Sequence, residues 1–147
     1  MSENELARTL AEVDLFSGLS ARVLSRIAEQ GTVSEYAAGA VVVTQGDAVS
    51  GFAAFAPRGA EMHVLLSGSA DVAVNGAVVR TLRPGEYFGE LSLVDGAPRS
   101  ADIVAGADGL STFALSKWTF EDLLEKHPEV ALPMLRVAIA RLRALES

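Results

Sequence analysis

Glu90 and Arg99 stand nine residues apart in the stretch FGELSLVDGAPRSA, which covers residues 88–101. Two glycines and a proline interrupt this stretch, so we expect a loop rather than a long helix or strand. In such a loop a carboxylate and a guanidinium can pair with each other on the surface, which contributes at most about 1 kcal/mol. Alternatively, the loop can cradle a small anionic ligand.

Several residue types in this loop suit an anionic group. Gly89 has no Cβ, so a ligand can approach the backbone closely there. Residues 90–94 can form one helical turn whose free N–H groups point at an anion. The planar fork of Arg99 suits two phosphate oxygens, and a charge-assisted bond of this kind contributes about 1.5 to 3 kcal/mol. Ser100 adds a hydroxyl, and its amide and that of Ala101 add further donors.

The composition is typical of a globular protein with one core. The chain has 147 residues, 50% of them apolar, which fits a single domain. Its net charge of −7 disfavours a general binder of nucleic acid or of membrane surfaces, because both require a basic field. A small anionic ligand remains compatible, since salt screens charges beyond about 8 to 10 Å.

Targeting signals and cysteines are not found in the sequence. The N-terminal segment has no apolar block of a signal peptide, and no run approaches the roughly 20 apolar residues that a membrane span needs. The chain has no cysteine, so neither disulfides nor thiolate chemistry are expected. These features fit a cytoplasmic protein.

The order of elements is predicted to be helices, then a small antiparallel barrel, then helices. Apolar residues recur at helical spacing in residues 1–31 and again in residues 116–147. In residues 32–115, short runs rich in β-branched residues are divided by turns, as in a sandwich or barrel. Asn75-Gly76 lies between two alternating apolar runs, which is the strongest hairpin signal.

Capping residues predict where the helices begin and end. Ser20 is a suitable N-cap, Gly31 a suitable C-terminal stop, and Ser116 a suitable N-cap after the strands. Pro128 fits the first turn of the following helix, whereas Pro133 is expected to kink or split it.

The stretch FGELSLVDGAPRSA resembles the phosphate-binding cassette of cyclic nucleotide-binding domains. These domains occur in regulators of the catabolite-activator type, in regulatory subunits of protein kinase A and in cyclic nucleotide-gated channels. The resemblance covers about residues 10–145 and implies a mainly β fold, a double-stranded β-helix (jelly-roll) barrel with flanking helices. The residues that match the cassette pattern are Phe88, Gly89, Glu90, Leu91, Ser92, Leu93, Pro98, Arg99, Ser100 and Ala101, and all but Leu93 are expected to line the ligand.

The resemblance implies a role for each charged residue of the cassette. It assigns Glu90 to a ribose 2′-hydroxyl and Arg99 to a cyclic phosphate, beside the amides around Gly89 and Ser100. This agrees with side-chain chemistry, since an ionised carboxylate can only accept hydrogen bonds and therefore suits a hydroxyl. A phosphate and a ribose hydroxyl held by one loop describe a compact nucleotide, such as a 3′,5′-cyclic nucleotide.

The base of the nucleotide is predicted from the same resemblance. Members that prefer cGMP often have Thr after the cassette arginine, and Ser100 stands there in this sequence, which favours cAMP over cGMP. The base is expected to lie against the hairpin strands around Val72 and Val74. Arg141 or Arg143, on the last helix, is expected to cap it.

Metal and nucleophile chemistry are not expected. His63 and His127 are the only histidines and stand 64 residues apart, so they do not form the ligand cluster of the metal-binding small-barrel enzymes. His63 is read as a structural residue of a strand. No serine stands in a nucleophile elbow, so the chain is predicted not to be an enzyme and to need no cofactor.

Two functions remain open on the sequence. In the first, a ligand binds the cassette and moves the last helix, residues 134–145, about a hinge at Pro133. In the second, the fold has lost its ligand and presents residues 51–60 of the long loop 48–60, with Phe52 and Phe55, and the apolar stripe of the last helix to a protein partner. The same helix could also pair with its copy in a homodimer. No helix-turn-helix follows the last helix, so this chain alone is not expected to bind DNA.

Overall fold

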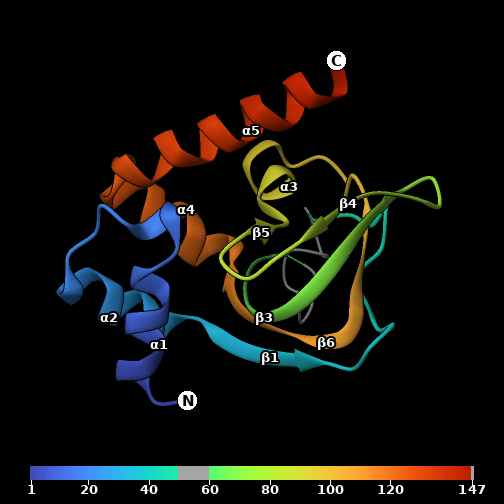
Figure 1. The fold of residues 1–147 in the computed structure, drawn as a ribbon. Coiled ribbons are helices and arrows are strands. Elements are labelled where there is room, and N and C mark those ends of the chain that lie inside the picture. Colours follow the sequence, from blue (N-terminus) through green and yellow to red (C-terminus); the bar gives the residue numbers. More distant parts are fainter. Residues whose placement is uncertain (50–59, 147) are drawn as a thin grey trace. The chain divides into compact units, whose positions relative to one another are not determined.

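The structure, a computed structural model, describes residues 1–49 and 60–146 (Figure 1). Most of the predicted loop 48–60, including Phe52 and Phe55, lies outside these residues. The chain divides into two compact units. One contains the N-terminal residues to Glu29 together with the C-terminal helices from Trp118, and the other contains the strands between Gln30 and Lys117.

The strand unit is one antiparallel sheet. In the part of the chain that the structure describes, the strands follow the order β1-β6-β3-β4, with β2 also paired to β6 and β5 to β3. The mainly antiparallel β class is therefore confirmed. The strands are β1 Thr32–Tyr36, β2 Val41–Val43, β3 Glu61–Val74, β4 Ala77–Leu82, β5 Tyr87–Phe88 and β6 Asp102–Ser116.

The predicted hairpin is present between β3 and β4. Asn75 and Gly76 have φ angles of 52° and 82°, and positive values at both central residues are what a type I′ turn requires. Val74 pairs with Ala77 directly beside the turn. The sequence signal at this position is therefore confirmed.

Strands β3 and β6 are longer than the short runs predicted from the sequence. They continue past Gly68 and Gly109, which have φ angles of 78° and 76°. The two glycines face each other so closely that a Cβ on Gly68 would collide with the carbonyl group of Gly109. The register shifts near Gly68, as at a β-bulge, so the glycines bend the long strands instead of ending them.

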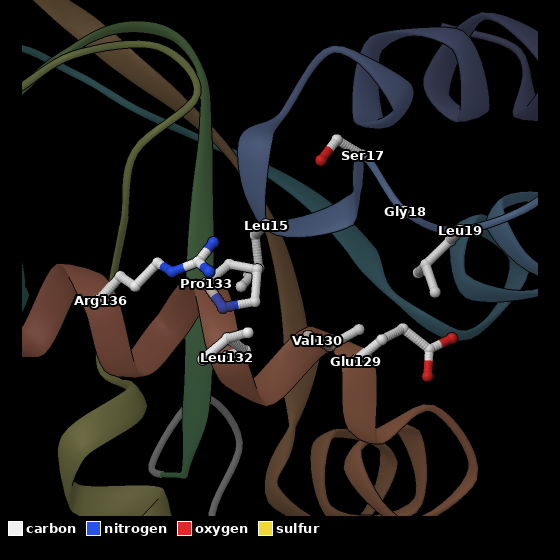
Figure 2. A pocket seen from close by; sticks show the side chains of 9 residues that line it. All are labelled: Leu15, Ser17, Gly18, Leu19, Glu129, Val130, Leu132, Pro133 and Arg136. Atoms are coloured by element: carbon white, nitrogen blue, oxygen red, sulfur yellow. The ribbon is translucent and has the colours of Figure 1, made fainter.

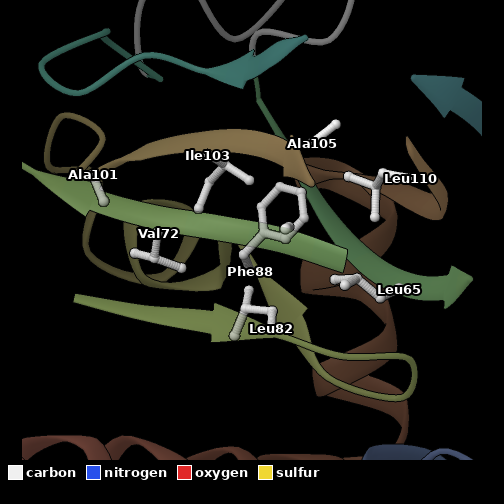
Figure 3. Packing of buried hydrophobic residues seen from close by; sticks show 9 residues of the cluster. Leu65, Val72, Leu82, Phe88, Ala101, Ile103, Ala105 and Leu110 are labelled. Carbon is white, nitrogen blue, oxygen red and sulfur yellow. The ribbon is translucent and has the colours of Figure 1, made fainter. Parts of the chain in front are cut away.

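The core of the sheet unit holds both ends of the cassette. Phe88 and Ala101 are buried and belong to one apolar cluster with residues of β3, β4 and β6 (Figure 3). Burying such side chains contributes about 1.5 to 3 kcal/mol each for the larger ones. The same packing that stabilises the sheet therefore also fixes where the cassette begins and ends. The cluster comprises Leu65, Ala70, Val72, Leu82, Phe88, Ala101, Ile103, Ala105 and Leu110.

Helices occupy both chain ends, as predicted. Ser20 Oγ accepts a hydrogen bond of 3.3 Å from the N–H of Val23, so Ser20 caps the second helix, which ends just before Gly31. Within residues 1–49 and 60–146, no helix has the length and apolar character needed to cross a membrane. The helices are α1 Glu3–Ala11, η1 Asp14–Phe16, α2 Ala21–Gln30, α4 Lys117–Lys126, η3 Pro128–Val130 and α5 Ala131–Glu146.

The predicted split of the helix at Pro133 is wrong. Helix α5 runs through this residue without a split, and Pro133 is its third residue. The first four N–H groups of a helix have no intrahelical partner, so a proline in the first turn removes no hydrogen bond. The interruption lies earlier instead, at the 3-10 segment that Pro128 begins.

Candidate functional site

The cassette forms a short helix between two glycines, as its sequence predicts. Helix α3, Glu90–Asp95, starts after Gly89, whose φ is 89°, and ends before Gly96, whose φ is 72°. Both values lie in the left-handed region, which glycine adopts without steric cost. A Cβ on Gly89 would lie 2.8 Å from the carbonyl oxygen of Glu61 and 3.1 Å from Nη1 of Arg99. Gly89 is therefore required both by its conformation and by the space around it.

Arg99 closes the cassette from the opposite end. Its Nη1 donates a hydrogen bond of 2.8 Å to the carbonyl oxygen of Gly89, and its Nη2 donates one of 2.8 Å to that of Glu61. Burial lowers the pKa of the Arg99 guanidinium, while the negative charges of Glu61, Glu90 and Asp47 oppose this shift. The guanidinium stays positive, and two of its five donors are engaged by the backbone.

Backbone hydrogen bonds hold Arg99 on its other side. The N–H of Gly46 donates to the carbonyl oxygen of Arg99, and the N–H of Arg99 donates to that of Asp47, both at 2.8 Å. Inside the cassette, Ser92 Oγ donates to the carbonyl oxygen of Pro98 at 3.3 Å. Main-chain contacts therefore set the position of the arginine before any ligand is considered.

Glu90 and Arg99 are not a surface ion pair. Their exposed fractions are 6% and 5%, so both charges lie inside the fold. A buried charge is costly unless it is paired or hydrogen-bonded, and the two carbonyl oxygens that receive the Arg99 fork supply part of that compensation. The interpretation of Glu90 and Arg99 as an exposed ion pair on a surface loop is therefore wrong.

The rest of the cassette divides into buried and exposed residues. Phe88, Ser92 and Ala101 are buried, whereas Leu91 is 47% exposed. Pro98 and Ser100 are also exposed. The hydroxyl of Ser100 thus lies at the surface of the loop, next to the buried arginine.

His63 supports the cassette from β3, consistent with its structural reading. Its ring stacks on Phe88, with centroids 4.8 Å apart and an interplanar angle of 10°. Nδ1 of His63 and Oγ1 of Thr112 lie 2.9 Å apart in a buried hydrogen bond. The register that pairs His63 with Phe88 brings the two rings together, and no local sequence pattern predicts this pairing.

The residues predicted to face the base lie on β3. Val72 is buried in the core cluster, and Val74 is half-buried against it. Arg80 of β4 is paired with Val72 and is half-buried, and Leu82 follows on the same face of the strand. Sequence reasoning missed Arg80, although the alternation that places Leu82 in the core also places Arg80 on that face.

Arg141 and Arg143 both lie on α5, in the helical unit. The same unit contains a cavity of about 180 Å³, lined by residues around η1 and the start of α5, among them Leu15, Val130 and Pro133 (Figure 2). The cavity contains no cassette residue. In the described part of the chain, no group of histidine, cysteine, aspartate or glutamate residues could hold a metal ion.

The sequence profile of the cyclic nucleotide-binding domain family matches residues 33–127 of the chain. This range includes the cassette and, apart from Thr32, all the strands of the sheet. A cAMP-dependent protein kinase regulatory subunit of Aspergillus niger is 37% identical over 101 residues, which cover 67% of this chain and 22% of that protein. A cyclic nucleotide-gated potassium channel of Mesorhizobium japonicum is 33% identical over 138 residues, covering 94% of this chain and 35% of the channel.

Among solved structures, the catabolite activator protein of Thermus thermophilus has a similar fold. The TM-score is 0.73 at 27% identity, over 90% of this chain and 59% of that chain. The chain therefore spans well under half the length of these two sequence relatives and somewhat over half of this structure.

Proposed function

The chain belongs to the cyclic nucleotide-binding domain family, and from this membership we propose that it is a sensor domain that binds a 3′,5′-cyclic nucleotide, cAMP in preference to cGMP. The observation that carries the proposal is the geometry of the cassette. Glu90 and Arg99 are both buried in one loop, and Gly89, in a left-handed conformation, lies close to Arg99 and to the Glu61 carbonyl of β3. Buried opposite charges beside a glycine-bounded helical turn suit a ligand that has both a phosphate and hydroxyl groups.

Each part of the nucleotide is assigned to a set of residues. Arg99 binds the cyclic phosphate, because its fork has donors beyond the two that the backbone engages. Glu90 accepts a hydrogen bond from the ribose 2′-hydroxyl. The base lies against Val72 and Val74. The other residues assigned to the ligand are Phe88, Gly89, Leu91, Ser92, Pro98, Ser100 and Ala101, with Arg141 or Arg143 as the cap on the base.

Signalling is proposed to work by a population shift. The nucleotide prefers one arrangement of the chain and draws the population toward it, which requires several kcal/mol of differential affinity. Helix α5 is proposed as the moving part, and Pro133, in its first turn, as the hinge. The domain itself carries out no reaction, and its output depends on a protein that it contacts.

Finer features of the molecule are part of the same proposal. The sheet closes into a jelly-roll barrel, and residues 1–147 act as one domain, with residues 1–31, 32–115 and 116–147 as its three segments. The domain works in the cytoplasm without a cofactor, a DNA partner or a membrane. A protein partner, or a second copy, docks on the C-terminal helix. The cAMP-dependent protein kinase regulatory subunits among its relatives support a regulatory role.

Isothermal titration calorimetry tests the function directly. The purified chain is titrated with cAMP, cGMP and AMP. We expect a dissociation constant of about 1 µM or lower for cAMP, equivalent to about −8 kcal/mol, and no binding of AMP. Arg99→Lys keeps the charge but loses the fork, so it should weaken cAMP binding strongly, whereas Arg83→Ala, at an exposed arginine of the same unit, should not.

An interaction module without a ligand is the alternative. Exposed leucines on α5, such as Leu135 and Leu142, both more than half exposed, are the observation in its favour. It is not favoured, because it makes no use of the Arg99 donors beyond the two that the backbone engages. In the calorimetric experiment this alternative predicts no heat with any of the three nucleotides and no difference between the Arg99 and Arg83 variants.

A further inference from the structure

Gln45 joins parts of the sheet unit that are far apart in the sequence. Its Nε2 donates to Oδ1 of Asn75 at 3.1 Å, and the backbone N–H of Asn75 donates to Oε1 of Gln45 at 2.8 Å. The backbone N–H of Gln45 donates to Oδ1 of Asp102 at 2.7 Å. Gln45 therefore ties the turn after β2 both to the tip of the β3–β4 hairpin and to the start of β6.

The turn that Gln45 fixes is also the turn that holds Arg99. Gly46 and Asp47, the next two residues, exchange backbone hydrogen bonds of 2.8 Å with the carbonyl oxygen and the N–H of Arg99. A continuous series of hydrogen bonds thus runs from Asn75, through Gln45 and its turn, to the main chain of the cassette arginine. Its hydrogen bonds join segments that are 30 or more residues apart in the sequence.

The two ends of this series lie on different walls of the proposed ligand site. Val72 and Val74, just before the hairpin tip, are assigned to the base, and Arg99 is assigned to the phosphate. A ligand that touches both walls binds well only if their separation is held closely, since small displacements weaken several contacts at once. The β3–β4 hairpin ends in an exposed turn, so its tip gains a fixed position from the contact with Gln45.

We propose that Gln45 is a positioning residue that holds the hairpin wall of the site in register with the cassette arginine. This inference rests on the proposed nucleotide function. Glutamine is suited to the role because its amide both donates and accepts, which matches the Oδ1 and the N–H that Asn75 presents. A carboxylate at this position can accept from the N–H but cannot donate to Oδ1.

A pair of ligands separates positioning from general stability. The full nucleotide cAMP touches both walls, whereas ribose 3′,5′-cyclic phosphate, which has no base, touches only the cassette. Gln45→Ala should weaken cAMP binding about tenfold and change the affinity for the base-free ligand by no more than about twofold. A tenfold loss is about the net contribution of one hydrogen bond. Gln45→Glu should lie between the wild type and Gln45→Ala.

The control variant is Thr81→Val on the same hairpin. Thr81 Oγ1 donates to Oδ1 of Asp71 at 2.9 Å, so this change also removes one cross-strand side-chain bond but does not affect the turn of Gln45. It should change the affinity for neither ligand by more than about twofold. An equal loss for both ligands in Gln45→Ala, or the same pattern in Thr81→Val, would overturn the positioning role.

Amide hydrogen exchange in the ligand-free protein tests the series without any nucleotide. In Gln45→Ala the N–H groups of Gly46 and Arg99 should exchange about tenfold faster, because the turn that pairs with them opens more often. The N–H of Leu65, which donates to the carbonyl oxygen of Glu86, is the internal reference, and its exchange rate should not change. If the wild-type protein bound neither ligand, the proposed nucleotide function would be wrong, but the exchange rates would still show whether Gln45 holds the turn at Arg99. Unchanged exchange at the N–H of Arg99 in Gln45→Ala would overturn the inference about Gln45.

Discussion

Gly89 gives Arg99 both a hydrogen-bond acceptor and the space to reach it. The carbonyl oxygen of Gly89 accepts from Nη1 of Arg99 at 2.8 Å, and a Cβ on Gly89 would lie 3.1 Å from the same nitrogen. The glycine is therefore part of the arginine's binding position, besides being the residue at which helix α3 begins. Changes at Gly89 should affect the position of Arg99 directly.

Gly89→Ala should lower the free energy of unfolding by at least about 2 kcal/mol. Left-handed strain accounts for about 1 to 2 kcal/mol, and displacement of the Glu61 carbonyl or the Arg99 fork adds to it. Urea unfolding measures the loss. The matched control is Gly96→Ala, where φ is 72° but no atom of the described residues other than its chain neighbours lies within 4 Å of the new Cβ, so only the strain is expected. Equal losses for the two variants would contradict this assignment.

Glu90→Gln should distinguish the ribose hydroxyl from the rest of the ligand. A neutral amide is a weaker acceptor than a carboxylate, so we expect cAMP to bind about tenfold more weakly, equivalent to about 1.4 kcal/mol. Binding of 2′-deoxy-cAMP, measured by the same calorimetry, should be weak for the wild type and nearly unchanged by the substitution. If both ligands lost affinity by the same factor, Glu90 would not contact the 2′-hydroxyl.

Thr112→Val should destabilise the fold by about 1 to 3 kcal/mol. It replaces a completely buried hydroxyl by a methyl group of similar size and removes the partner of Nδ1 of His63. Thr112→Ser keeps the hydroxyl and loses only a methyl group, so it serves as the control in thermal unfolding. A larger loss in the serine variant than in the valine variant would show that packing, and not the hydrogen bond, sets the stability here.

Arg80→Ala should shift the preference between bases. Arg80 is paired with Val72, so a base that lies against Val72 comes within reach of its guanidinium. An arginine fork can donate to both O6 and N7 of guanine, whereas adenine offers N7 beside an amino group. We therefore expect the variant to lose cGMP affinity about tenfold more than cAMP affinity. Competition binding with both nucleotides measures the ratio, and an unchanged ratio would exclude contact with the base.

Pro133→Ala should alter the response to the ligand more than the affinity for it. Pro133 lies in the first turn of α5, where the restored N–H has no intrahelical acceptor, so stability should change little. Spin labels on α3 and α5 report the distance between these helices with and without cAMP. A ligand-induced change of the same size in wild type and variant would show that Pro133 is not the hinge.

Local signals in the sequence predicted much of this structure. Asn75-Gly76 forces a type I′ turn, and the two glycines around residues 90–95 delimit one short helix, because these conformations depend on a few neighbouring residues. The predicted helix ends at Ser20 and Gly31 were confirmed for the same reason. Turns and helix ends that depend only on neighbouring residues could therefore be predicted from the sequence.

Contacts between distant segments could not be predicted. The second acceptor of Arg99 is the carbonyl of Glu61, 38 residues away, and every residue has such a carbonyl, so no side-chain pattern marks it. The bend at Gly68 and Gly109 depends on two glycines meeting across two strands, and no local pattern shows which glycines meet. Pro133 was misread because a proline breaks a helix only beyond its first turn.

The central place of β6 also determines when the molecule can fold. This strand pairs with β1, β2 and β3, and the pair Thr32–Ala114 closes a loop of more than half the chain. Such non-local pairing makes folding slow, because the entropy of closing long loops is lost before the contacts form. During synthesis on the ribosome, β1 and β3 emerge well before β6, so they cannot pair with this common partner until it has been synthesised. Because Arg99 lies just before β6, we expect the proposed ligand site to be completed only when this strand pairs with the others, late in folding.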